Sequence, residues 1–308
     1  MSGVVWAAIA GVLFGVFQSV NRVTLVDMDV YASTFVQLVV CSLFMLGALA
    51  VQGGGLEGLS VSAGANFAVA GLIHFVGGWT LLNLSQKRLG AARTSPLIAT
   101  TPLFAVVIAW LTLDEVPGAL ELAGMATIVA GVYVTRIDEL RSARLRVPVG
   151  AGGRPTSEAA GSVPIAWSIF GLGAAFAWAV SPIFIRNGLD EIDRPVLGVT
   201  VGVLAATAAY GLVLVGRRRR AVLGSASRGA LAGKVVAGVL VGLATWTRWY
   251  ALSLTTVAAV LSLALLSVPT VIVLAPALAG RRLERVTLSV VSGAALVVAG
   301  ALVLIVQG

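Results

Sequence analysis

The sequence predicts an all-α, polytopic membrane protein with ten transmembrane helices arranged as two inverted five-helix repeats. Three observations predict this fold: the scarcity of charge, the recurrence of long apolar runs, and the likeness of the second half of the chain to the first. Of the 308 residues, 58% are hydrophobic and 11% are charged, whereas a soluble domain carries about 25% charged residues. A water-soluble surface cannot be built from this composition.

The helices are predicted from ten apolar runs that follow one another along the chain. A hydrocarbon core about 30 Å thick requires about 20 helical residues, because each residue rises about 1.5 Å. The runs lack strict two-residue alternation and are too long for the strands of a membrane barrel. They cover residues 4–20, 31–51, 63–83, 91–113, 118–135, 165–185, 196–215, 235–254, 257–279 and 288–306.

The two halves of the chain match each other in three blocks that keep the same order. Residues 13–29 match residues 177–193, and residues 90–102 match residues 257–269. In the third block Glu115, Gly124, Ala130 and Gly131 match Glu284, Gly293, Ala299 and Gly300. Five is an odd number of spans, so two such copies have opposite orientations in the membrane, as in secondary transporters. The expected units are a first repeat, an extramembrane linker and a second repeat, at residues 1–135, 136–164 and 165–308.

Basic residues concentrate in alternate connections between the apolar runs. One set holds Arg22, Lys87, Arg88, Arg136, Arg141, Arg144, Arg146, Arg154, Arg217, Arg218, Arg219, Arg220, Arg228, Lys234, Arg281, Arg282 and Arg285. The other set holds only Arg186 and Arg194. By the positive-inside rule, the linker is expected in the cytoplasm and both termini outside the plasma membrane. The net charge of +8 is then explained by basic cytoplasmic loops that face anionic lipid headgroups. No nucleic-acid partner is expected.

The paired segments "LGAARTSPLIATTPLF…DE" and "TTVAAVLSLALLSVPTV…LE" resemble the EamA-like branch of the drug/metabolite transporter superfamily. The resemblance implies ten helices, two inverted repeats and transport of a small organic solute, often by export. Two features depart from the family. Asp114 and Leu283 stand where the family has a glycine before the glutamate, and many relatives keep both termini in the cytoplasm.

Polar side chains inside the spans are the candidates for a solute site. An ionisable residue at the centre of a span costs about 2.5–3.5 kcal/mol, so such residues usually face a protein-lined cavity. Aromatic residues near span ends are also candidates, although they commonly form an interfacial belt. The candidates are Gln18, Asn21, His74, Trp79, Asn83, Arg93, Thr100, Trp178, Trp246, Arg248, Tyr250 and Ser267.

The fourth span carries the most unusual combination of residues. Arg93 shares a helix face with Thr100, and Thr100 matches Ser267 in the second half, which predicts a cavity face with a hydroxyl in both copies. Alternatively, Arg93 extends to the basic loop beside it. Three prolines are expected to bend the fourth and ninth spans, with or without contact to the solute. They are Pro96, Pro102 and Pro269.

His74 is the only histidine in the sequence. Its side chain titrates near neutral pH and could carry a coupling proton, but a hydrogen-bonded structural histidine is the other interpretation. No Asp or Glu lies deep inside a span; Glu121 and Glu284 lie near span ends. The charges inside the spans are therefore cationic, which favours an anionic or zwitterionic solute.

The pattern as a whole predicts a secondary transporter that moves a small organic solute, such as an amino acid or another metabolite, across the plasma membrane by alternating access. Export is the expected direction, and spans one, three and four with six, eight and nine are expected to line the path. A pore or channel-like facilitator is the alternative. An enzyme is not expected, since H-E-x-x-H and G-x-S-x-G are absent. Neither cofactor nor metal is expected, and the partners are the solute, the lipid bilayer and at most a weak second copy.

Overall fold

The computed structural model describes residues 2–113, 117–135, 137, 165–216 and 227–307, and within these residues all regular structure is helical. The predicted all-α fold is confirmed. In the described part of the chain, nine helices are long and apolar enough to cross a membrane, and Ala119–Thr135 is a shorter apolar helix. The predicted linker 136–164, apart from residue 137, lies outside the described residues, as do Asp114, Glu115 and Arg217 to Arg220.

In the first half, the first and second spans are single helices, and the third and fourth spans each consist of more than one helical segment. The fifth span is the shorter apolar helix. The elements are α1 (Gly3–Leu25), α2 (Val30–Val51), α3 (Val61–Gly71), η1 (Leu72–Trp79), α4 (Thr80–Leu89), α5 (Ala91–Ile98), α6 (Thr101–Leu113) and α7 (Ala119–Thr135). The third span is continuous through α3, η1 and α4, where η1 is a π-helix. The fourth span is interrupted between α5 and α6.

The second half repeats this order with one difference in its third member. Its elements are η2 (Ile165–Trp167), α9 (Ser168–Glu191), α10 (Pro195–Gly216), α11 (Arg228–Leu254), α12 (Val257–Ala264), α13 (Ser267–Ala279) and α14 (Leu288–Gln307). The eighth span, α11, is one uninterrupted α-helix, whereas its counterpart contains the π-helix. The ninth span is interrupted between α12 and α13, as the fourth is between α5 and α6.

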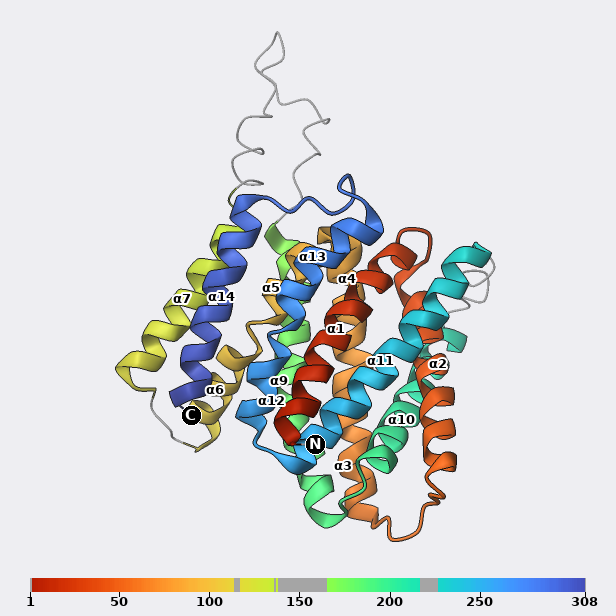
Figure 1. Ribbon diagram of the computed structural model, residues 1–308. Coiled ribbons are helices and arrows are strands. Elements are labelled where there is room, and N and C mark those ends of the chain that lie inside the picture. The colour runs from red at the N-terminus through yellow and green to blue at the C-terminus, as the bar shows by residue number, and fades with distance from the viewer. Residues whose placement is uncertain (1, 114–116, 136, 138–164, 217–226, 308) are drawn as a thin grey trace.

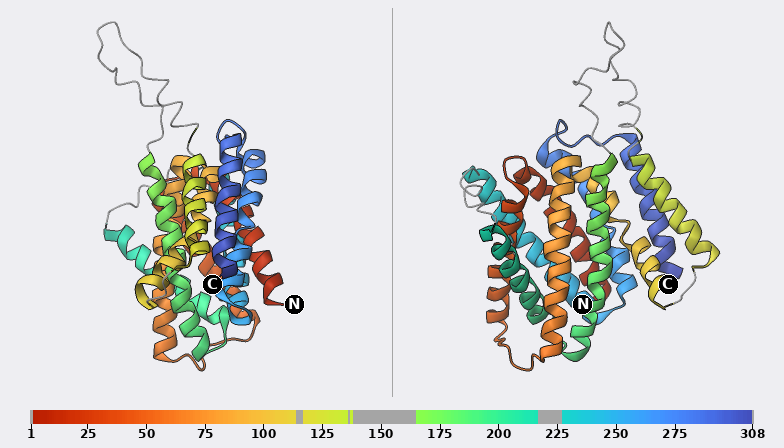
Figure 2. Two further views of the ribbon diagram at one scale, coloured as in Figure 1. Left: turned by 90° about the vertical axis from the view of Figure 1, so that its left-hand side faces the viewer. Right: turned by 180° about the vertical axis from the view of Figure 1, so that it is seen from behind.

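The first helix of each half runs antiparallel to the third span of the other half. Gly3, at the start of α1, lies against Leu254 at the end of α11, and Gly188, near the end of α9, lies against Phe67 in α3, the first part of the third span. Figures 1 and 2 show α1 and α9 running in opposite directions. The first helix of each half therefore packs against the opposite half, in the arrangement expected of two inverted repeats.

The second and fifth spans of each half pack against their counterparts in the other half. Helix α2 packs against α10, and α7 packs against α14 at one side of the molecule (Figure 1). Gly131 of α7 and Gly293 of α14 let this last pair approach closely, because a Cβ on either would meet the other's carbonyl oxygen at 2.7 Å. The boundaries 1–135 and 165–308 for the two repeats remain predictions.

Corresponding serine residues begin the third span of each half. Ser60 accepts a hydrogen bond from the backbone N–H of Ala63 at 2.9 Å, and Ser227 accepts one from Ala230 at 3.1 Å. Each side chain satisfies one of the free N–H groups of a helix start. The two caps therefore set the same register in both copies.

The interruption of the fourth span has a local chemical cause. Pro102 is the second residue of α6 and has no N–H to donate to the carbonyl of Ile98, four residues earlier. The hydroxyl of Thr101 donates to that carbonyl instead, at 2.7 Å. In the ninth span Pro269 stands three residues into α13, and the N–H of Val268 donates to Leu265 at 3.0 Å. Both spans thus break beside a proline with the freed carbonyl satisfied.

The two ends of the molecule differ in which helices begin and end there. The Glu284 end is the one at which α1 ends, α5 and α11 begin and α13 ends; it is the upper end in Figure 1. The Trp6 end is the opposite one, at which α1, α3 and α12 begin and α11 ends. Both described termini lie toward the Trp6 end.

Candidate functional site

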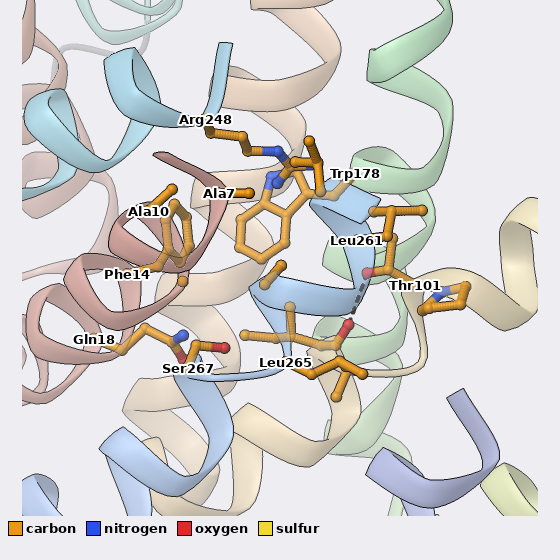
Figure 3. A pocket seen from close by; sticks show the side chains of 16 residues that line it. Ala7, Ala10, Phe14, Gln18, Thr101, Trp178, Arg248, Leu261, Leu265 and Ser267 are labelled. Atoms are coloured by element: carbon orange, nitrogen blue, oxygen red, sulfur yellow. Dashed lines mark hydrogen bonds between the residues drawn. The ribbon is translucent and has the colours of Figure 1, made fainter. Parts of the chain in front are cut away.

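A cavity lies between the two halves, beside the interruptions of the fourth and ninth spans. Helices α1, α6, α9, α11, α12 and α13 and the segment around Ile98 and Ala99 line it (Figure 3). Its volume is ≈ 50 Å³, and since one water requires about 10–15 Å³, it has room for about four water molecules. The cavity therefore matches the size of a small polar group in this conformation.

Arg248 supplies a cation to this cavity from α11. The residue is buried, and its Nε and Nη2 atoms have no hydrogen-bond partner among the described residues. Figure 3 shows the side chain reaching toward the indole of Trp178. Unpaired buried polar groups are rare in native structures and each calls for an explanation. A guanidinium with free donors in a cavity is suited to a planar carboxylate.

Gln18 and Ser267 lie at the other end of the same cavity (Figure 3). Both polar atoms of the Gln18 amide are buried without a hydrogen-bond partner in the described part of the chain. Gly15, one turn earlier on α1, brings this helix against α13, since a Cβ there would lie 2.9 Å from the carbonyl oxygen of Ser267. The cavity thus offers an amide donor and acceptor opposite a cation.

Trp178 forms one wall and is held on two sides. Its indole Nε1 donates to the carbonyl of His74 at 3.2 Å, and its ring meets Phe14 edge to face with 5.3 Å between centroids. Gly78 makes room for the indole, because a Cβ at that position would lie 2.3 Å from Nε1. His74 and Gly78 both belong to the π-helix η1, an element that occurs frequently at functional sites.

Of the candidates named from the sequence, Gln18, Trp178, Arg248, Ser267 and Pro102 line this cavity. Arg93 and Thr100 do not. Arg93 is half-buried and its Nη1 lies 3.5 Å from the carbonyl of Leu89, while the hydroxyl of Thr100 donates to Leu97 at 2.6 Å. The cation of the cavity comes from α11 and not from the fourth span.

Three further candidates lie outside the cavity lining. His74 is buried with its Nδ1 at 2.9 Å from the hydroxyl of Ser181, and Trp79 is fully buried in the hydrophobic core. Pro96 lies inside α5 and is buried. All three residues lie inside the protein but outside this cavity, and the Nε2 of His74 and the Nε1 of Trp79 have no hydrogen-bond partner among the described residues.

Trp246 and Tyr250 belong to a second cavity, at the Trp6 end. They pack around Trp6, which meets Tyr250 edge to face at 5.2 Å between centroids. This cavity has a volume of ≈ 360 Å³, and Asp193 and Arg194 also line it. The aromatic residues of α11 therefore lie apart from the cavity that holds Arg248.

Asn21 and Asn83 join a buried polar cluster near the Glu284 end, here called the amide cluster. Its members are Asn21, Gln37, Asn83, Gln86 and Lys234, and each is fully buried. The Nδ2 of Asn21 donates to Asn83 and to Gln86, each at 2.8 Å. The ammonium or amine of Lys234 donates to Asn21 and, at 2.8 Å, to Gln37.

The interpretation of Lys234 and Arg22 as loop charges is wrong. Lys234 lies within α11 and is fully buried, and Arg22 lies within α1 with a residue exposure of 8%. Both fall close to the ends of apolar runs, where hydropathy alone does not separate a span from its loop. The helices extend beyond the apolar runs and carry these cations inside the protein.

Glu284 is a structural acid that the sequence interpretation placed only near a span end. Its carboxylate pairs with Arg22, with 2.5 Å between Nε and Oε1, and accepts from the N–H groups of Ala91 and Ala92 at 3.0 and 2.9 Å. A carboxylate at the start of α5 is stabilised by the helix dipole. The match of Glu284 with Glu115 in the alignment of the two halves was the feature of the sequence that could have singled out this residue.

Comparison with known proteins gives a family over the first half and a fold over the whole chain. Residues 1–137 match the profile of the EamA-like transporter family. No curated protein matches the sequence. Among solved structures, 22 chains match. One of them, titled "Crystal structure of protein", is 18% identical, covers 98% of this chain and 99% of its own, and gives a TM-score of 0.62. This likeness supports the fold alone.

Proposed function

We propose that this multi-pass membrane protein, whose residues 1–137 match the model of the EamA-like transporter family, is a secondary transporter for a small organic anion or zwitterion. The solute places its carboxylate on Arg248, in the cavity between the halves. The observation that carries this assignment is the buried guanidinium whose Nε and Nη2 have no partner among the described residues.

The lining of the cavity supports a solute with both polar and apolar parts. Arg248 and Gln18 offer polar atoms, while Phe14, Trp178 and Leu265 supply apolar surface. Ligand sites commonly combine a mostly apolar wall with a few placed polar groups. Amino acids and short organic acids have this composition, whereas an organic cation would meet the like charge of Arg248.

Alternating access suits the position of the cavity. It lies beside the interruptions of the fourth and ninth spans, and the packing of α1 against α11 and α9 against the third span exchanges partners between the halves. Rocking of one repeat against the other would open the cavity to one side and then to the other. Export across the plasma membrane is the direction that the family resemblance favours.

A thermal-shift experiment on the purified protein tests the assignment of Arg248. The probes are L-alanine, L-glutamate, pyruvate and choline, applied to the wild type, Arg248→Met and Arg93→Met. Binding to the folded state raises the melting temperature. We expect at least one carboxylate, and not choline, to stabilise the wild type and Arg93→Met but not Arg248→Met. Equal stabilisation of all three proteins would remove Arg248 from the site, and a shift with choline alone would overturn the solute class.

A further inference from the structure

The amide cluster contains a lysine in an unusual position. Lys234 lies in the second turn of α11, donates to side chains of α1 and α2, and is fully buried. It lies apart from the cavity of Arg248, which is 14 residues further along the same helix. The proposed solute site makes no use of this group.

The hydrogen bonds around Lys234 fix how many donors it can use. The Nδ2 of Asn21 donates to Asn83 and Gln86, so its Oδ1 must be the atom that faces Lys234. The Nζ of Lys234 donates to this oxygen and to Oε1 of Gln37. A lysine ammonium has three donors, whereas a neutral amine has two. The two described acceptors match the neutral amine.

The charged side chains around the amide cluster have other partners and do not neutralise an ammonium at Lys234. On α1, Arg22 pairs with Glu284. On α4, Lys87 donates to the carbonyls of Leu25, Val26 and Met28 at the end of α1, and Arg88 lies over the ring of Trp167.

The other elements that pack against α11 supply no acid that pairs with Lys234. Asp29, the N-cap of α2 at the same end of the molecule, accepts from the backbone N–H groups of Tyr31 and Ala32. Helices α2, α10 and α12 contain no Asp, Glu, Lys or Arg, and Tyr31 and Tyr210 are their titratable side chains besides the buried thiol of Cys41. The charged residues of α9, which are Arg186, Asp190 and Glu191, lie at the Trp6 end. On α11 itself, Arg228 is exposed at the first residue. No described carboxylate pairs with Lys234, and an unpaired buried ammonium is costly.

The duplicated fold shows that this position does not require an amine. Ser60 and Ser227 cap corresponding helices, and the same spacing from these caps leads to Phe67 in the first half and Lys234 in the second. Phe67 packs against Gly188 and Gly198 as an ordinary core residue. An apolar side chain therefore serves the packing of the first copy, while the second keeps a titratable group at a cost.

We propose that Lys234 is a proton-binding site of the transport cycle. In the described conformation the side chain is a neutral amine held by Asn21 and Gln37. When α1, α2 and α11 separate at the Glu284 end, water reaches the amine, and its lone pair takes a proton from a hydronium ion. One N–H bond forms as one O–H bond of the hydronium breaks, and a neutral water molecule is left. Reclosure requires release of the proton, so solute movement is coupled to a proton. The coupling rests on the proposed transport function, but the protonation state does not.

Nuclear magnetic resonance of ¹⁵N-lysine-labelled protein in lipid nanodiscs tests the site directly. Lys87 and Lys234 are the only lysines in the sequence, so Lys87→Arg leaves a single Nζ signal. We expect an amine shift at pH 7 that converts reversibly to an ammonium shift on acidification while the protein stays folded. An ammonium shift at pH 7, or an amine that protonates only on unfolding, would overturn the proposal.

Transport in proteoliposomes separates this inference from the proposed function. The probe is L-alanine, L-glutamate or pyruvate, whichever stabilises the protein in the thermal assay, with and without a pH gradient. We expect the gradient to drive accumulation by the wild type, and Lys234→Met to keep exchange but lose that accumulation. If Lys234→Met accumulates the probe as the wild type does, proton coupling through Lys234 is wrong although transport stands. If neither protein moves a probe, transport fails and the resonance experiment alone decides the proton site.

Discussion

Arg22 on α1 and Glu284 between α13 and α14 form a buried ion pair across the two halves, with 2.5 Å between Nε and Oε1. The same carboxylate accepts from Ala91 and Ala92 at the start of α5. Asn21, the neighbour of Arg22, belongs to the amide cluster. One acid therefore ties the first helix, the broken fourth span and the second repeat together at the Glu284 end.

Removing the charge of Glu284 should destabilise the protein strongly. Loss of one partner from a buried ion pair costs about 3–5 kcal/mol, because the other charge stays buried and unpaired. We expect Glu284→Gln to lower the melting temperature measured in detergent. Arg281→Gln is the control, since Arg281 is exposed on the same connection. Equal melting temperatures for the two variants would show that the ion pair contributes nothing to stability.

Gly90 should tolerate no side chain, for two separable reasons. Its φ of 87° is unfavourable for other residues, and a Cβ would lie 2.7 Å from Oε1 of Glu284. Gly280 has a similar φ of 83° but no atom near its Cβ position. We expect Gly90→Ala to lower the melting temperature more than Gly280→Ala does. The difference measures the contact with Glu284, and no difference would contradict the assigned packing.

Gly78 should be needed for the shape of the solute cavity. A Cβ at this position would lie 2.3 Å from the Nε1 of Trp178, whereas at Gly77 the nearest atom is 4.0 Å away. We expect Gly78→Ala to displace the indole and abolish the thermal shift produced by the carboxylate probe. Gly77→Ala should retain the shift. A full shift in Gly78→Ala would mean that Trp178 does not shape the binding site.

The helices and the breaks could be predicted from the sequence because each depends on neighbouring residues. Hydropathy over one span identifies a membrane helix. Proline has no backbone N–H in any tertiary context, so Pro102 interrupts the helical hydrogen bonds whatever packs around it. In the alignment of the two halves Pro102 also matches Pro269, and the fourth and ninth spans are interrupted next to these residues. The ten-helix architecture followed from such local information.

The composition of the site could not be predicted in the same way, because it depends on which helices meet. Arg93 and Arg248 are both cations in or near spans, and only packing places Arg248 at the cavity. Gln18 and Asn21 were both candidates for one solute site, yet Gln18 lines the cavity and Asn21 binds Lys234. The partner of Glu284 comes from the opposite half of the chain.

The most direct test of solute binding by Arg248 is counterflow in proteoliposomes, with the stabilising carboxylate as the labelled probe. We expect saturable uptake by the wild type that speeds up when unlabelled carboxylate is loaded inside. Arg248→Met should lose this uptake, and Arg93→Met should stay close to the wild type. Flux that never saturates would indicate a pore, and uptake that is unchanged in Arg248→Met would contradict the central claim that this guanidinium binds the transported solute.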